Sequence, residues 1–94
     1  MEMEQRREHR FKPNQTATVK VFGLEPGLVI KVHILDVSGN GMCLGSKLPV
    51  PCGTLVEIEV ADTLAFGEIC RCESGQDSYQ LGVQVSAIEI LTAK

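Results

Sequence analysis

Residues 28–35 read Leu-Val-Ile-Lys-Val-His-Ile-Leu, and residues 36–41 continue as Asp-Val-Ser-Gly-Asn-Gly. In the first segment every even-numbered residue is apolar, and residues two apart lie on the same face of an extended chain. This alternation is typical of a β-strand that is buried chiefly on one face. The second segment consists mainly of the residue types that turns select. A strand that ends in a tight turn is therefore predicted here.

The same alternation recurs on both sides of this segment. Upstream, Ala17, Val19 and Val21 share one face of a predicted strand, and the stretch from Gly23 to Gly27 provides a tight connection. Downstream, Pro49 and Pro51 forbid regular pairing between Lys47 and Gly53, so that stretch is predicted to be a loop. Further strands are predicted at residues 42–44, 54–60, 65–73 and 79–86.

Six short strands with turns at regular spacing indicate an all-β fold, a small six-stranded antiparallel β-barrel. Closing the sheet into a barrel removes its exposed edges. The barrel domain is predicted over residues 15–94. Residues 1–14 are polar, strongly charged and without apolar periodicity, and we interpret them as a flexible N-terminal arm. Near the end, the spacing of Ile88 and Leu91 leaves open whether Ala87 to Ala93 forms a short helical turn.

Composition limits the classes of function. The chain has 94 residues, of which 44% are hydrophobic and 22% charged, as expected for one globular domain. Its net charge of −3 opposes a surface for long polyphosphate chains, so we expect no nucleic-acid binding and expect any anionic ligand to be small. No stretch approaches the roughly 18 apolar residues of a membrane span. We therefore expect a cytoplasmic protein without membrane insertion.

Four cysteines, Cys43, Cys52, Cys70 and Cys72, are present in a chain that begins without an apolar secretory leader. Disulfides are rare in the cytoplasm, so we interpret all four as reduced thiols.

The first candidate motif is Arg6-Arg7-Glu8-His9-Arg10, in which Arg6 and Arg10 are four residues apart. In an extended arm, side chains at this spacing point to the same side. The planar guanidinium group can make two hydrogen bonds to a phosphate or to guanine O6 and N7, and it can stack on a purine. Two such groups facing one site are suited to a nucleotide.

The second candidate motif is Asp36-Val37-Ser38-Gly39-Asn40-Gly41, a D-x-S-x-x-G pattern at the end of a strand. An ionised Asp36 only accepts hydrogen bonds, which suits the N1–H and amino donors of guanine, and the Ser38 hydroxyl can bond alongside it. Gly41 allows a close backbone approach or a positive φ angle. The same residues would also suit a simple turn, so this motif indicates a binding site only in combination with the Arg6 and Arg10 motif.

An Arg-bearing arm before the first strand, followed one hairpin later by D-x-S-x-x-G, resembles the PilZ domain family of bacterial cyclic di-GMP receptors. The resemblance runs from Gln5 to about Ser86 and includes Leu81-Gly82-Val83-Gln84-Val85, which looks like the family's closing barrel strand. It implies a ligand, cyclic di-GMP, with no cofactor and no catalysis. It also implies a protein partner in a motility, polysaccharide or biofilm pathway.

By this resemblance Arg6 and Arg10 hold the phosphates and contact the guanines, while Asp36, Ser38 and Gly41 form the opposite wall of the site. Arg7 and Asn40 are secondary candidates, because the motif leaves their positions free. Many members of the family continue into a C-terminal helix, and here only Ala87 to Lys94 remains.

Four other interpretations were weighed. Gly41-Met42-Cys43-Leu44-Gly45 matches G-x-C-x-G with His33 nearby, but a nucleophile elbow needs a following helix, so no enzyme is predicted. Cys70 and Cys72 would share a strand face, yet the paired knuckles of zinc sites are missing, so no metal site is predicted. The four aromatic residues are too scattered for a single-stranded nucleic-acid platform. The remaining alternative is a PilZ-type interaction module that binds no nucleotide.

Overall fold

The computed structural model describes residues 15–23 and 27–91. Six antiparallel strands form a closed barrel in the order β1-β2-β3-β6-β5-β4. Within these ranges there is no helix long and apolar enough to cross a membrane. The strands are β1 (Gln15–Val21), β2 (Val29–Ser38), β3 (Gly41–Ser46), β4 (Leu55–Val60), β5 (Thr63–Ser74) and β6 (Tyr79–Ile90). The predicted all-β six-stranded barrel is confirmed, and the arm predicted over residues 1–14 lies outside the described residues.

The barrel interior is filled by the alternate apolar residues that the sequence pattern indicates. In β2, Ile30, Val32 and Ile34 are buried, while Lys31 and His33 between them face outward and are exposed. Strands β1 and β4 show the same alternation. Because residues two apart face the same side of a strand, one apolar face from each strand builds a single core. Its buried members are Ala17, Val19, Val21, Ile30, Val32, Ile34, Met42, Leu44, Val50, Val56, Ile58, Val60, Ala65, Ile69, Leu81 and Val83.

The loop between β3 and β4 contributes one residue to this core. Val50 lies between Pro49 and Pro51 and is only 1% exposed, so the loop closes one end of the barrel with an apolar side chain. The buried Ser46 hydroxyl at the start of the loop donates to the Leu48 carbonyl at 2.7 Å and accepts from the Leu48 amide at 3.0 Å. Both hydrogen-bonding functions of this hydroxyl are thereby satisfied inside the protein.

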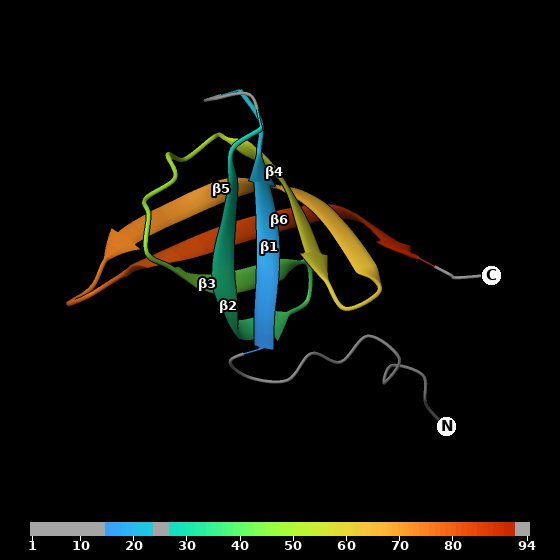
Figure 1. Ribbon diagram of the computed structural model, residues 1–94, viewed down its shortest axis with the longest axis horizontal. Coiled ribbons are helices and arrows are strands. Elements are labelled where there is room, and N and C mark those ends of the chain that lie inside the picture. The colour runs from blue at the N-terminus through green and yellow to red at the C-terminus, as the bar shows by residue number, and fades with distance from the viewer. Residues whose placement is uncertain (1–14, 24–26, 92–94) are drawn as a thin grey trace.

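The strand order departs from chain order at two points, where β3 pairs with β6 and where β1 pairs with β4 to close the barrel. Figure 1 shows β1 and β2 crossing in front of the long β5–β6 hairpin, which forms the rear of the barrel. This arrangement places β2, β3, β6 and β5 side by side on one continuous outer surface.

The question of a helical turn near the C-terminus is decided in favour of a strand. β6 continues to Ile90, where Ile88 pairs with Ala65 and Ile90 with Thr63, and the Leu91 amide donates to the Asp62 carbonyl at 2.6 Å. The i,i+3 spacing of Ile88 and Leu91 is therefore not helical, because a long β5 offers backbone partners to this stretch.

Gly67 marks the tightest approach between β5 and β6. Ser86 is an extra residue in β6 opposite the step from Phe66 to Gly67, and its hydroxyl donates to the Phe66 carbonyl at 3.1 Å. A Cβ atom at position 67 would overlap the Gln84 carbonyl oxygen and lie 2.9 Å from Cγ1 of Val83. Only glycine fits beside this β-bulge, because the obstructing atoms belong to the backbone as well as to a core side chain.

We predict that Gly67→Ala lowers the free energy of unfolding by about 1–3 kcal/mol, the usual cost of inserting a carbon into a packed site. Urea denaturation followed by circular dichroism measures the change. Gly45→Ala is the matched control, since a Cβ there meets only Leu35 side-chain atoms at ordinary contact distances of 3.5–3.6 Å. Equal stabilities of the two variants would contradict the predicted clash.

Candidate functional site

Asp36, Ser38 and Gly41 line one hollow of about 210 Å³ on the outer surface of β2, β3, β5 and β6. The structure thus brings together the three predicted site residues that lie in the barrel. The arginines predicted to complete the site, Arg6 and Arg10, and the secondary candidate Arg7 lie outside the described residues. The hollow is also lined by Met42, Cys43, Cys70, Arg71, Gly82, Val83 and Gln84, none of which the sequence patterns had assigned to the site.

The hollow follows from the register of four neighbouring strands. One row across the sheet consists of Asp36, Cys43, Gly82 and Arg71, each paired with the next. In the adjacent row, Ser38 pairs with Gly41, which pairs with Gln84. The middle positions of the two rows have a short side chain or none; they are Cys43, Gly82 and Gly41. The flanking positions have polar side chains; they are Asp36, Arg71, Ser38 and Gln84. A depression with a polar rim results on the outside of the barrel.

A β-bulge in β2 directs Asp36 and Ser38 into this hollow. Ile34 pairs with Leu44 and Asp36 pairs with Cys43, so Leu35 is an extra residue without a partner in β3. Strict alternation after the buried Ile34 and the exposed Leu35 would turn Asp36 toward the barrel interior. The extra residue shifts the alternation by one position. Asp36 and Ser38 therefore face solvent.

A second bulge, in β5, does the same for Arg71. Ile69 pairs with Val83 and Arg71 pairs with Gly82, which leaves Cys70 as the extra residue. The prediction that Cys70 and Cys72 share a strand face is therefore wrong. Cys70 is exposed and lines the hollow, whereas Cys72 is half-buried and packs against the core.

The turn between β2 and β3 consists of Gly39 and Asn40 alone, because Ser38 pairs with Gly41. Gly39 has a φ angle of +54°, and a glycine at the first of two loop residues is typical of a type II′ hairpin turn. The positive φ that the sequence allowed for Gly41 therefore belongs to Gly39, and Gly41 is a strand residue. Asn40 lies at the edge of the site, where its carbonyl accepts from the Val85 amide at 2.7 Å.

Arg71 lies across Gly82 on the side of the hollow opposite Asp36. A Cβ atom at position 82 would stand 3.1 Å from Cβ, 3.3 Å from Cζ and 3.5 Å from Nη1 of Arg71. The absence of a side chain at Gly82 therefore lets the guanidinium group rest on the sheet. Nε of Arg71 is 3.6 Å from Oε2 of Glu73, and the two side chains are 52% and 61% exposed. Such an exposed ion pair is weak and leaves the guanidinium group able to bind an anion.

The site therefore presents an acceptor and a donor on opposite walls. Asp36 accepts hydrogen bonds, Ser38 can both donate and accept, and Arg71 offers several N–H donors in a planar fork. Within the described ranges, no group of three or more His, Cys, Asp or Glu side chains could hold a metal ion. Cys43 lies inside β3 and is followed by a loop and β4, whereas the nucleophile in a nucleophile elbow is followed by a helix. The arrangement is suited to binding a polar anionic ligand with donors of its own.

Comparison with known proteins gives one result. The family model described as PilZ domain matches residues 4–93, nearly the whole chain. No curated protein and no solved structure shows a significant match.

We predict that Gly82→Ala displaces the Arg71 side chain while the barrel stays folded. The added methyl group would take the space next to Cβ and Cζ of Arg71. The Nε–Hε signal of Arg71 in a nitrogen–proton NMR spectrum should shift, and the same signal should stay in place in Gly45→Ala. An unchanged Arg71 signal in Gly82→Ala would contradict the contact.

Proposed function

The chain belongs to the PilZ domain family, and on that premise we propose that it is a bacterial receptor domain that binds cyclic di-GMP and catalyses no reaction. The observation that carries the proposal is the hollow in which Asp36, Ser38 and Gly41 lie together, with Arg71 on the facing wall. All three specified residues of the D-x-S-x-x-G motif therefore line one surface.

In this proposal the Asp36 wall recognises guanine. The Asp36 carboxylate accepts from N1–H and the amino group of the base, and the Ser38 hydroxyl bonds to an adjacent polar atom. Gly41 lines the hollow without a side chain, so the ligand can approach the backbone of β3 at this position. Adenine lacks this pair of donors and would leave the carboxylate without partners, which is the basis of selectivity.

The phosphates require cationic partners, and Arg71 is the one that the described barrel supplies. A hollow of about 210 Å³ is smaller than typical small-molecule sites, which measure roughly 300–1,000 Å³. A cyclic dinucleotide bound here would therefore need a second wall. We assign that wall to Arg6 and Arg10 of the N-terminal arm.

The signal in this proposal is a rearrangement of the arm. When Arg6 and Arg10 engage the ligand, residues 1–14 close over the hollow, with Arg7 and Asn40 as auxiliary contacts at its edge. Closure changes the surface that the domain offers to a protein partner in a motility, polysaccharide or biofilm pathway of the bacterial cytoplasm. This switch is driven by the differential affinity of the ligand for the closed form.

We predict that calorimetric titration shows binding of cyclic di-GMP and much weaker binding of GTP and cyclic di-AMP. Asp36→Asn should reduce the preference for guanine, because the amide presents donors where the base also donates. Glu59→Gln on the exposed outer face of β4 removes the same charge far from the hollow and serves as the control. Absent binding of all three nucleotides would overturn the proposal in favour of an interaction module.

We further predict that Arg10→Gln and Arg71→Gln each weaken cyclic di-GMP binding about ten- to a hundredfold, as expected for loss of a charge-assisted hydrogen bond worth roughly 1.5–3 kcal/mol. Lys20→Gln, on the exposed face of β1, removes one positive charge elsewhere and should leave the affinity unchanged. A full loss in Arg10→Gln without any change in Arg71→Gln would remove Arg71 from the site.

A further inference from the structure

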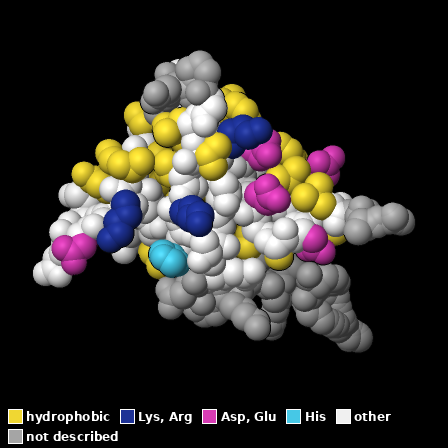
Figure 2. Space-filling view, viewed as in Figure 1, with side chains coloured by type: hydrophobic (Ala, Val, Ile, Leu, Met, Phe, Trp, Pro, Cys, Tyr) yellow, Lys and Arg dark blue, Asp and Glu magenta, His cyan; other side chains and the backbone are white. Residues whose placement is uncertain are grey.

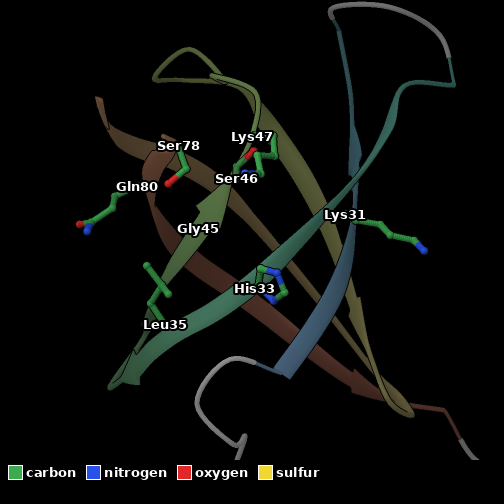
Figure 3. A pocket seen from close by; sticks show the side chains of 8 residues that line it. All are labelled: Lys31, His33, Leu35, Gly45, Ser46, Lys47, Ser78 and Gln80. Carbon is green, nitrogen blue, oxygen red and sulfur yellow. The ribbon is translucent and has the colours of Figure 1, made fainter. Parts of the chain in front are cut away.

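A second and larger hollow, of about 560 Å³, lies on the same outer surface and shares no residue with the first. Its lining includes Lys31, His33 and Leu35 of β2 and Lys47 just after β3 (Figure 3). Its floor follows one cross-strand row in which His33 pairs with Gly45 and Gly45 pairs with Gln80. The missing side chain at Gly45 makes the row concave.

This hollow continues into a shallower apolar one. The neighbouring hollow is also lined by Lys31 and Lys47, and it ends at Val29 and Leu48. Those two side chains are 50% and 48% exposed. At the other end of the groove, the bulge residue Leu35 packs over Gly45 and is 38% exposed. We call the combined surface from Leu48 to Leu35 the lysine groove.

Among the described residues, the lysine groove carries positive charge without a paired carboxylate. No carboxylate lines either of its two hollows. Among the described residues neither Lys31 nor Lys47 forms an ion pair, although the whole chain has a net charge of −3. Beside the histidine, Figure 2 shows cationic side chains on this face, while most of the acidic side chains in view gather toward the right. Lys20, by contrast, lies directly opposite Glu57 in the register of β1 and β4.

We propose that the lysine groove binds an extended acidic segment of a partner protein that presents carboxylates and apolar side chains on the same face. In Figure 3 the Lys31 side chain extends away from Lys47, so the charges are spread along the groove instead of converging on one phosphate. Side chains two apart share one face of an extended chain, and the exposed row of β2 reads Val29, Lys31, His33, Leu35. A segment with two carboxylates at alternate positions, flanked at the same spacing by apolar residues, therefore complements this row. No aromatic residue lines the groove, which leaves a nucleic-acid strand without a stacking platform.

This inference goes beyond nucleotide binding and does not depend on it. Leu35 and Asp36 are neighbours in the same bulge, so the lysine groove and the nucleotide hollow adjoin along β2. The two surfaces nevertheless use different residues, and each can be tested in the absence of the other's ligand.

The test uses a short fluorescent peptide, Leu-Ser-Glu-Ser-Glu-Ser-Leu, whose Leu and Glu side chains share one face of an extended chain. A peptide with Gln in place of both Glu residues is its comparison. Anisotropy should show binding of the acidic peptide that weakens as salt is added, because exposed ion pairs are screened. Amide shifts in an NMR titration should concentrate at Lys31, His33, Gly45, Lys47 and Gln80. The double variant Lys31→Gln/Lys47→Gln should weaken binding about five- to tenfold, in line with two exposed ion pairs, while Lys20→Gln should bind as the unmodified chain does.

Several outcomes would overturn the inference. These are equal binding of the Glu and Gln peptides, an equal loss in Lys20→Gln, shifts that map to the nucleotide hollow, or equally tight binding of oligothymidylate at the groove. The shift map of the unmodified chain decides the location even if the double variant does not fold. Failure of this test leaves the cyclic di-GMP titration unaffected, because no nucleotide is present.

Discussion

The rest of the structure depends on one constraint, which is that each residue of a closed six-stranded barrel faces either the interior or solvent. The interior is filled mainly by apolar side chains, and six of them have almost no exposed surface: Val19, Ile34, Leu44, Ile58, Ile69 and Leu81. A shift of one residue in any strand would exchange its two faces and bury its polar residues without partners. Register is therefore strongly specified wherever the core is continuous.

The candidate site arises where this alternation is shifted without loss of the core. The extra residues Leu35 in β2 and Cys70 in β5 each move the following residues by one position. After each bulge the polar residues that follow, Asp36 and Arg71, face outward. β3 and β6 lie between the two bulged strands and contribute Gly41 and Gly82, which leave room on the surface. The same β-bulges that fit long strands into a closed barrel therefore also produce a polar hollow on its outer surface.

The two hollows give the outer surface of β2, β3 and β6 two different chemical characters. The hollow between Asp36 and Arg71, for which we propose a nucleotide ligand, combines an acceptor wall at Asp36 with a donor wall at Arg71. This combination suits a ligand that has both an anionic group and hydrogen-bond donors. The lysine groove has cations and apolar side chains but no carboxylate, which suits an acidic polypeptide. Because the surfaces adjoin at Leu35 and Asp36, a change of conformation in the β2 bulge would reach both.

The sequence by itself determined the strands, their buried faces and three of the ten residues that line the candidate site, Asp36, Ser38 and Gly41. Alternation in 28–35 and 54–60 is a local property, and so is the preference of Asp, Ser, Asn and Gly for the turn after Leu35. The sequence did not reveal that Val50 belongs to the core, that β6 continues to Ile90 or that Arg71 lines the candidate site. Those depend on which strands pair across the barrel. Only the tertiary structure decided that β3 lies beside β6 and that bulges turn Asp36 and Arg71 to the same surface, because pairing partners and bulge positions are set by closure of the whole sheet and not by any one strand.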